Sequence, residues 1–229
     1  MLSTHQVGFP PAESALAEPN GLLAVGGELT PRWLLAAYAR GIFPWFDDDA
    51  SPVLWWSPDP RAVLIPEELR VTRSLAKRIR NAGFVLTMDR AFADVVAACA
   101  EPRSADTGTW ITPEMAHAYG ELHTMGFAHS VEVWLDGKLV GGLYGVSLGR
   151  MFFGESMFAR ERDASKVALY YLTMNVRDSN FTLIDCQIMN EHLRSLGVRE
   201  MPRAEFLDLV RRNENEPTRR GSWACEIGG

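Results

Sequence analysis

The pattern of apolar and polar positions becomes regular from residue 84 onward. Alternating or unbroken apolar runs mark strands, whereas apolar residues three and four apart mark one face of a helix. In chain order the pattern predicts a strand over 84–88, helices over 90–100 and 112–125, strands over 129–135, 138–146 and 150–154, a helix over 164–177, a strand over 181–186, a helix over 190–196, a strand over 198–201 and a helix over 203–212. Asp136-Gly137 between two strands signals a two-residue hairpin.

The first third of the chain follows another pattern. Thr30 as N-cap and Pro31 at the first helical position begin a helix that Gly41 ends. The aromatic segments 43–45 and 55–61 that follow are rich in proline, which interrupts regular structure, and they predict a packed irregular loop. Tryptophans in such loops are mostly core anchors, but they also serve as stacking platforms for bases.

Two domains are expected from this change of pattern. Residues 1–75 would form a small N-terminal α/β domain with aromatic loops, and residues 76–229 a larger second domain. The boundary should fall between Pro66 and Phe84. The expected fold class is α+β, with a mixed sheet flanked by helices in the second domain.

Polar side chains stand at the ends of two apolar strands. Glu155 follows the strand 150–154, and Asp185 and Gln187 end the strand one helix later. Two parallel strands joined by a helix would bring both carboxylates out at the same end of a sheet, where α/β proteins build their sites. The pattern predicts a catalytic cleft there. The alternative is that both carboxylates are buried structural groups paired with Arg or Lys.

Composition narrows the class of protein. With 47% hydrophobic and 23% charged residues the chain is typical of a globular protein, and its start has no signal-peptide pattern. No apolar run approaches the roughly 18 residues of a membrane helix. The three cysteines lack metal-type spacing and fit a reducing cytoplasm, the expected location. No metal site is expected, because the five histidines are also spaced too far apart to share an ion.

The net charge of −6 argues against a general polyanion binder but leaves room for a local one. A basic stripe lies along a predicted helix over 70–80, and its members are Arg70, Arg73, Lys77, Arg78 and Arg80. The simpler interpretation of this stripe is a solvated helix face.

The order of elements resembles the fold of GCN5-related N-acetyltransferases, whose fourth and fifth strands separate into a V. In this sequence those strands would end with Glu155 and Asp185. The acetyltransferases hold coenzyme A on a glycine-rich turn at a helix N-terminus. The corresponding segment 156–163 has no glycine, so the sequence does not predict that an acyl-coenzyme A is the donor substrate.

Several motifs in order resemble the leucyl/phenylalanyl-tRNA–protein transferase family more specifically. They span most of residues 8–210 and comprise 21–24 (GLLA), 41–45 (GIFPW), 56–61 (WSPDPR), 109–112 (TWIT), 141–145 (GGLYG), 154–158 (GESMF), 164–166 (ASK), 183–187 (LIDCQ) and 195–197 (SLG). Ala159 departs from the serine common in the family. The resemblance implies transfer of leucine or phenylalanine, and less readily methionine, from aminoacyl-tRNA to the α-amine of proteins beginning with Arg or Lys, which marks them for degradation. It implies no separate cofactor.

The resemblance also implies site residues. Asp185 would orient or relay through Gln187 to the attacking amine, and Glu155 would pair with the cation of the acceptor's first residue, although the two carboxylates could exchange roles. Cys186 would face away from them. Trp45 and Trp110 would hold the terminal adenosine, and the basic helix would contact the acceptor stem. The walls of the donor pocket would be Leu143, Phe152, Met157, Leu169, Leu172 and Ile184.

Two alternatives remain open at this point. A coenzyme A-dependent acetyltransferase is disfavoured by the missing glycine turn. A non-catalytic tRNA-binding module could use the same tryptophans and the same basic helix.

Overall fold

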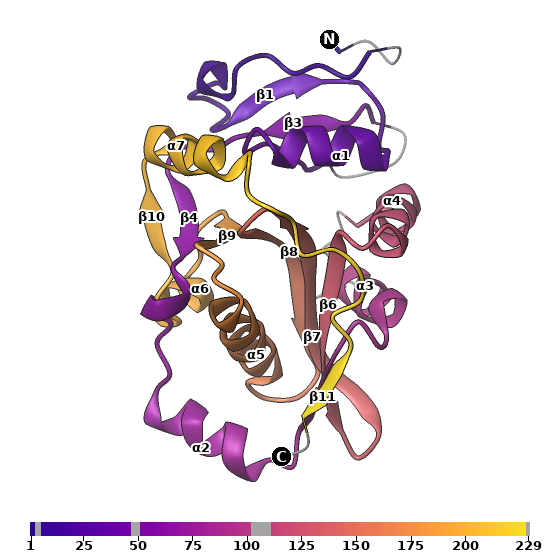
Figure 1. The fold of residues 1–229 in the computed structure, drawn as a ribbon, viewed down its shortest axis with the longest axis vertical. Coiled ribbons are helices and arrows are strands. Elements are labelled where there is room, and N and C mark those ends of the chain that lie inside the picture. The colour runs from indigo at the N-terminus through magenta and orange to yellow at the C-terminus, as the bar shows by residue number, and fades with distance from the viewer. Residues whose placement is uncertain (3–5, 47–50, 102–110, 228–229) are drawn as a thin grey trace.

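The larger of two sheets has eight strands in the order β10-β4-β9-β8-β7-β6-β5-β11 (Figure 1). The computed structural model describes residues 1–2, 6–46, 51–101 and 111–227. β8 and β9 pair in parallel, and the other neighbouring strands pair antiparallel. The strands are β4 (Arg61–Leu64), β5 (Val85–Met88), β6 (Ala128–Leu135), β7 (Lys138–Leu148), β8 (Met151–Ala159), β9 (Leu183–Gln187), β10 (Arg199–Met201) and β11 (Cys225–Ile227).

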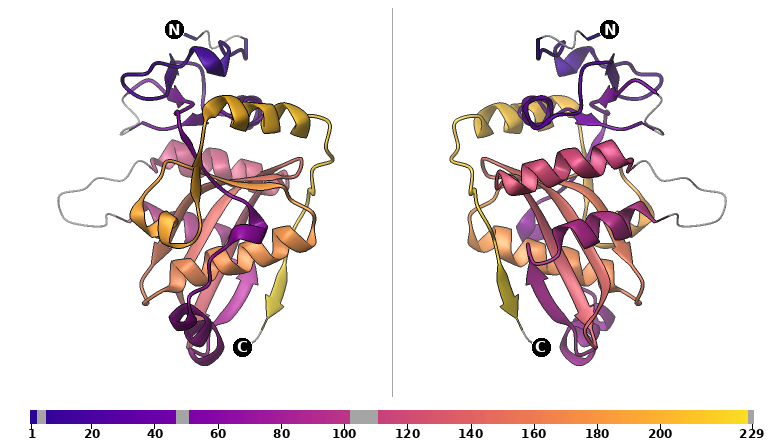
Figure 2. Two further views of the ribbon diagram at one scale, coloured as in Figure 1. Left: turned by 90° about the vertical axis from the view of Figure 1, so that its left-hand side faces the viewer. Right: turned by 90° about the vertical axis from the view of Figure 1, so that its right-hand side faces the viewer.

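Helices cover both faces of this sheet. α3 (Phe92–Ala100) and α4 (Pro113–Thr124) lie on one side of β6 to β8, and α5 (Ala164–Asp178) lies on the other (Figures 1 and 2). The remaining helices are α1 (Pro31–Tyr38), α2 (Arg73–Asn81), α6 (Glu191–Ser195) and α7 (Arg203–Asn213), with 3₁₀ turns η1 (Ala12–Ser14) and η2 (Pro66–Glu68). The expected mixed sheet flanked by helices is confirmed.

Two hydrophobic clusters result, one on each face. Phe152 and Phe153 are consecutive on β8, and because successive strand side chains point to opposite faces, Phe153 enters the first cluster and Phe152 the second. The first cluster holds α1, α3, α4 and α7 against the sheet, and the second holds α5.

Among the described residues, no helix is both long enough and apolar enough to cross a lipid bilayer.

The predicted elements from residue 84 onward are present with small shifts at their ends. The hairpin at Asp136-Gly137 is confirmed, and both residues have the positive φ that a tight two-residue turn requires. β8 is longer than predicted and continues through the expected turn as far as Ala159. β11 has no counterpart in the sequence-based prediction.

The aromatic, proline-rich region is more regular than predicted. It contains β2 (Phe43–Pro44) and β3 (Leu54–Trp56), which join β1 (Leu22–Val25) in a three-stranded sheet of order β1-β3-β2. Pro44 is compatible with pairing because β2 is an edge strand, where a missing N–H leaves no ladder bond unmade. The prediction of an irregular loop over this region is therefore wrong for these strands.

β4 links the two parts of the chain. It follows the small sheet in sequence, yet it pairs with β9 and β10 inside the large sheet. α7 lies between the small sheet and the rest of the molecule, and its N-terminal Arg203 donates to the Ser57 carbonyl at 2.7 Å (Figure 2). The division into residues 1–75 and 76–229 stays a prediction.

Candidate active site

A cavity of about 940 Å³ opens where β8 and β9 separate. The two strands pair only from Met151 to Phe153 of β8, after which β8 continues beside β7 and β9 continues beside β4. α5 and α6 close one side of the cavity. All six predicted pocket residues line it, together with Trp45: Leu143, Phe152, Met157, Leu169, Leu172 and Ile184.

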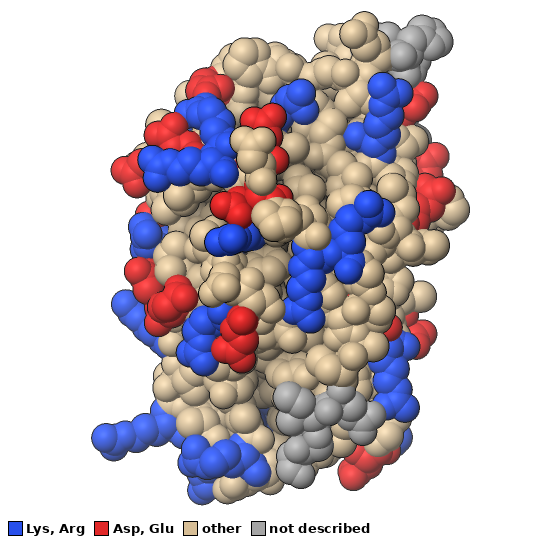
Figure 3. Space-filling model, in the orientation of Figure 1, with Lys and Arg blue, Asp and Glu red and all other residues tan. Residues whose placement is uncertain are grey.

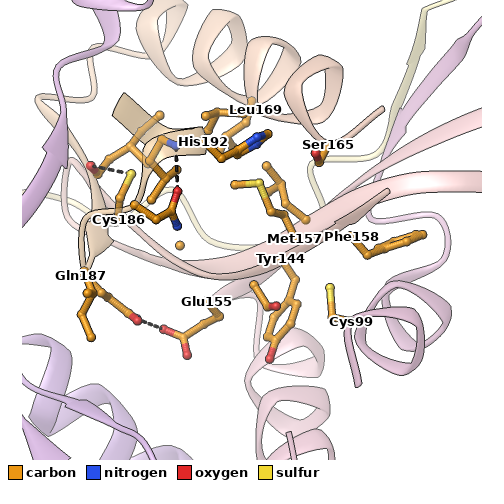
Figure 4. A pocket seen from close by; sticks show the side chains of 18 of the residues that line it. Cys99, Tyr144, Glu155, Met157, Phe158, Ser165, Leu169, Cys186, Gln187 and His192 are labelled. Atoms are coloured by element: carbon orange, nitrogen blue, oxygen red, sulfur yellow. Dashed lines mark hydrogen bonds between the residues drawn. The ribbon is translucent and has the colours of Figure 1, made fainter. Parts of the chain in front are cut away.

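Glu155 occupies a β-bulge at this point of separation. Tyr144 of β7 pairs with Ser156 and Gly145 pairs with Gly154, so Glu155 has no partner in the β7–β8 ladder. Bulges re-aim side chains and are common beside active sites. In Figure 4 the side chain of Glu155 points toward Gln187 across the gap between the strands. The residue as a whole is 9% exposed and lines the cavity.

Two tyrosines from distant helices hold Glu155. The Tyr38 hydroxyl of α1 is hydrogen-bonded to Oε1 at 2.7 Å, and the Tyr119 hydroxyl of α4 to Oε2 at 2.6 Å. The two hydroxyls also contact each other. Burial and, less strongly, the nearby charge of Asp185 raise the pKa of Glu155 to about 8, against the opposing effect of these hydrogen bonds.

Asp185 is fully buried and paired with Arg61 of β4. Its Oδ1 accepts from Arg61 Nε at 2.8 Å and its Oδ2 from Nη2 at 2.6 Å, a bidentate pair. The Arg61 guanidinium lies between the rings of Phe43 and Phe206, 4.7 and 4.5 Å from their centroids, and donates to the Gly41 carbonyl at 3.2 Å. The pairing with Arg, which the sequence left open as an alternative, is present for Asp185.

Gln187 connects the two carboxylates. Its main-chain N–H donates to Asp185 Oδ1 at 2.9 Å, and its side-chain Nε2 donates to Glu155 Oε1 at 2.8 Å. Its φ of 60° lies in the left-handed region, which is uncommon for a residue with a side chain. Asp185 therefore contacts Gln187 through the main chain, and the Gln187 carboxamide is oriented by Glu155 (Figure 4).

Cys186 sits between these residues at a second bulge, in the β4–β9 ladder. It packs against the second hydrophobic cluster, whereas Asp185 contacts Arg61 among aromatic residues of the first. Burial raises the pKa of the Cys186 thiol, so it stays protonated at neutral pH. A thiol in that state is a poor nucleophile.

Trp45 lies at the rim of the cavity. It is 39% exposed, and its ring stands edge to face with Trp56 at a centroid distance of 5.5 Å. An indole held in this way by a neighbouring ring offers a free surface for stacking. Trp110, the other residue expected to hold an adenosine, lies outside the described residues.

The basic stripe lies on α2 and on Arg70, three residues before the helix begins. Arg70, Arg73, Lys77 and Arg80 are exposed, and Figure 3 shows basic side chains gathered over α2 at the lower end of the molecule. Arg78 is half-buried over the ring of Phe84 and lies 3.5 Å from Glu161. Glu161 follows Arg160, which lines the cavity, so the loop after β8 connects the basic helix with the cavity rim.

Sequence reasoning missed Arg61, Tyr38 and Tyr119 as parts of the site. Arg61 belongs to the motif at residues 56–61, but no local sequence pattern indicates that its partner is Asp185, 124 residues away. Tyr38 and Tyr119 lie in predicted helices whose sequences carry no other sign of a site. Within the described ranges, no group of three or more His, Cys, Asp or Glu side chains is arranged to hold a metal ion.

Comparison with known proteins gives consistent matches over nearly the whole chain. The family model described as leucyl/phenylalanyl-tRNA protein transferase matches residues 63–211, and that of the corresponding N-terminal domain matches residues 27–59. A leucyl/phenylalanyl-tRNA–protein transferase of Aromatoleum aromaticum is 59% identical over 218 residues, covering 95% of this chain and 92% of the relative. One from Chromohalobacter salexigens is 57% identical over 222 residues, covering 97% and 86%.

Solved structures overlap with this chain at low sequence identity. A GCN5-related N-acetyltransferase from Kribbella flavida has 14% identity and a TM-score of 0.41, covering 73% of this chain and 59% of that one. The L-PGS structure from Bacillus licheniformis has 12% identity and a TM-score of 0.40, covering 68% and 50%.

Proposed function

Because this chain belongs to the leucyl/phenylalanyl-tRNA protein transferase family, we propose that it moves leucine or phenylalanine from aminoacyl-tRNA to the α-amine of proteins beginning with Arg or Lys. The chain is an aminoacyltransferase, and aminoacyl-tRNA is its donor substrate. The products would carry an N-terminal residue that marks them for degradation.

The observation that carries this proposal is the cavity itself. Six apolar side chains surround a space at whose edge a carboxyl and a carboxamide meet. An apolar pocket distinguishes side chains by only about 1–3 kcal/mol per methylene. Acceptance of leucine and phenylalanine, and weaker acceptance of methionine, is the selectivity that such a wall supports.

The reaction needs alignment more than activation, because the donor is an ester. The amine nitrogen forms a bond to the ester carbonyl carbon, the bond from that carbon to the ribose oxygen breaks, the amine loses a proton and the ribose oxygen gains one. An α-amine with a pKa near 8 is partly neutral at cellular pH, so a modest proton acceptor is sufficient. Alignment of the two groups contributes up to about 7–11 kcal/mol.

Gln187 is the residue best placed to align the amine. The Nε2 of Gln187 donates to Glu155, so the carboxamide oxygen of Gln187 is turned away from Glu155. That oxygen is left as an acceptor for the amine N–H. Asp185 positions Gln187 by holding its main-chain N–H, and Arg61 in turn holds Asp185. Asp185 is fully buried, so in this proposal it acts through Gln187 and does not touch the substrate.

Glu155 is the carboxyl that can contact the acceptor, because it lines the cavity and has no ion-pair partner among the described residues. We assign it to the cation of the acceptor's first residue. A charge-assisted hydrogen bond from Arg or Lys would satisfy a buried carboxylate that otherwise lacks a counter-charge. This assignment accounts for a requirement for Arg or Lys at the acceptor's N-terminus.

The tRNA would approach from the basic helix, with its terminal adenosine on Trp45. Replacing Lys77 and Arg80 by glutamine should weaken Leu-tRNA binding and lower the slope of log K against log salt by about 1 for each lost phosphate contact. Filter binding at several salt concentrations measures this slope. Arg40→Gln, which replaces an exposed arginine just after α1 and outside the basic stripe, is the control and should leave it unchanged.

A transfer assay tests the function directly. The protein is incubated with radiolabelled Leu-tRNA and peptides that begin with Arg, Lys or Ala, and label in the peptide is counted. We expect label in the Arg and Lys peptides only, and loss of transfer with retained tRNA binding in Asp185→Ala. Asp178→Ala, at the exposed end of α5, is the matched control. Tight tRNA binding without transfer by the wild type would instead support a non-catalytic tRNA-binding module.

A further inference from the structure

The hydroxyls of Tyr38 and Tyr119 and the carboxyl of Glu155 form a closed ring of three contacts. Tyr38 contacts Oε1, Tyr119 contacts Oε2, and the two hydroxyls contact each other. The three groups come from α1, α4 and β8, and both phenols are fully buried. The contacts with Oε1 and Oε2 are 2.7 and 2.6 Å long, and the two hydroxyl oxygens lie closer still, so each pair of oxygens needs a proton between them.

A count of protons decides the charge state that fits this ring. With Glu155 ionised, the two phenols supply two protons for three contacts, and two hydroxyl oxygens meet without a proton between them. With Glu155 neutral, three protons fill three contacts in one direction: Oε2–H donates to Tyr119, Tyr119 to Tyr38, and Tyr38 to Oε1. Gln187 Nε2 also donates to Oε1, which is therefore the carbonyl oxygen of the acid.

The surroundings of Glu155 favour the neutral acid as well. Burial and, less strongly, the charge of Asp185 oppose ionisation, and Arg61 is already paired with both oxygens of the Asp185 carboxylate. Two other titratable side chains interact electrostatically with these groups. Tyr144 of β7 interacts with the charge of Glu155, and Cys99 of α3 interacts with Tyr144. No cation among the described residues forms an ion pair with Glu155.

We propose that Glu155 carries a proton in the acceptor-free enzyme and releases it to solvent when the cationic side chain of the acceptor's first residue enters, so that acceptor selection exchanges one cation for one proton. This step rests on the proposed function. It makes Glu155 a specificity-determining residue, because burial keeps the acid neutral until a cation is present. A neutral first residue would meet a neutral acid and gain no ion pair.

The exchange makes acceptor binding depend on pH. Burial and the charge of Asp185 raise the pKa of Glu155 to about 8, so near pH 7 about nine molecules in ten hold the proton. The apparent affinity for a cationic acceptor should rise about tenfold per pH unit below pH 8 and level off above it, provided that the cation itself stays charged.

Calorimetry with a non-reacting ligand tests the exchange. A peptide that begins with a 5-guanidinopentanoyl group keeps the guanidinium and lacks the α-amine, so any proton released comes from the protein. Binding enthalpies in phosphate and in Tris, which differ in ionisation enthalpy, give the number of protons released. We expect about 0.9 per bound peptide at pH 7 and nearly none at pH 9.5. The isosteric neutral 5-ureidopentanoyl peptide should bind more weakly and release none.

Two variants identify the source of the proton. Glu155→Gln should bind the guanidinium peptide without proton release. Glu191→Gln replaces an exposed carboxylate that lines the same cavity and should release as many protons as the wild type. Binding by the wild type without release, or release that survives in Glu155→Gln, would overturn the proposal. Failure of the guanidinium peptide to bind at millimolar concentration would do the same.

Direct titration provides an independent measurement. Carboxyl ¹³C resonances of glutamate-labelled protein, assigned to Glu155 by comparison with Glu155→Gln, should titrate near pH 8 in the free enzyme. A midpoint below pH 6 would contradict the neutral ring. The transfer assay on ordinary Arg-starting peptides is run on the same preparation, so a failed exchange with intact transfer refutes this inference alone.

Discussion

Arg61 shows how one buried side chain supports the site without reaching the cavity. Its guanidinium uses both oxygens of Asp185, and it is held by the Gly41 carbonyl and by two aromatic rings. Gly41 has a φ of +71°, and a Cβ there would lie 2.8 Å from side-chain atoms of Phe206 and Leu207. The glycine that ends α1 is therefore also required for the packing around Arg61.

Arg61→Met should destabilise the protein by about 3–5 kcal/mol, because it leaves the buried Asp185 without a counter-charge. Urea unfolding measures the loss. Arg199→Met, which removes an exposed pair with Glu68, should cost no more than about 1 kcal/mol.

The double variant Arg61→Met with Asp185→Leu separates stability from positioning. Replacing both charges by apolar groups should recover much of the stability, since buried pairs contribute little net free energy. Transfer should stay low, because nothing then holds the Gln187 main chain. Recovered stability together with recovered transfer would show that the pair is only structural.

Glu155 makes the stability of the folded protein depend on pH in a defined direction. Its pKa rises from 4.5 to about 8 on folding, so between these values the folded chain holds a proton that the unfolded chain has lost. The stabilisation is complete below pH 4.5 and is lost as pH rises through 8. Relative to Glu155→Gln, the wild type should lose stability over this window, on the order of a few kcal/mol. Denaturant titrations at pH 5, 7 and 9 measure the difference, and a constant difference would refute the raised pKa.

At the scale of elements, the glycines of β7 determine how close α5 lies to the sheet. A Cβ on Gly141 would lie 2.4 Å from the Cβ of Ala164, at the start of α5. That helix carries Leu169 and Leu172 into the cavity wall. The close approach of helix and strand therefore sets the depth of the pocket.

Gly141→Ala should push α5 outward, lower stability by about 1–3 kcal/mol and raise the KM for Leu-tRNA. Gly120→Ala is the control, because a Cβ there meets nothing within 4 Å. As an ordinary helical position in α4, it should gain up to about 1 kcal/mol. Thermal unfolding and transfer kinetics distinguish the two, and equal behaviour of both variants would argue against the contact.

At the scale of the whole molecule, the segment after α7 runs along the protein to β11 at the edge of the large sheet (Figures 1 and 2). The ring of Trp223 stacks on that of His129 at a centroid distance of 3.9 Å, and the main-chain N–H of Trp223 donates to Asp89 Oδ2 at 2.7 Å. Asp89 also accepts from His129 at 2.8 Å. β11 then pairs with β5 at the edge of the large sheet.

Replacing two of the tryptophans by alanine should affect different properties of the protein, stability in one case and tRNA binding in the other. Trp223→Ala removes a buried ring that packs near Phe152 and Phe181 and should cost about 3–5 kcal/mol. Trp45→Ala removes an exposed ring at the cavity rim, so it should change stability little and weaken Leu-tRNA binding. Unfolding curves and binding constants for both variants test this contrast.

The amino-acid sequence by itself determined the order of the elements from residue 84 onward and placed Asp185 and Gln187 at the end of a strand, because periodicity and strand termination are local properties. The prediction that Glu155 follows its strand is wrong, since β8 continues to Ala159 and Glu155 lies at a bulge inside it. The motifs indicated the family and the walls of the pocket. Short strands such as β2, β4 and β11 escaped prediction, since two to four residues carry too little periodicity to be recognised.

Only the tertiary structure decided how the two carboxyls differ. The partner of Asp185 is 124 residues away, and the tyrosines that hold Glu155 are 81 residues apart from each other. No local pattern specifies such contacts, because they depend on which helix and strand faces meet when the chain packs. Glu155 therefore faces the cavity with hydroxyl partners, while Asp185 is buried against a guanidinium, although both follow apolar runs of similar appearance in the sequence.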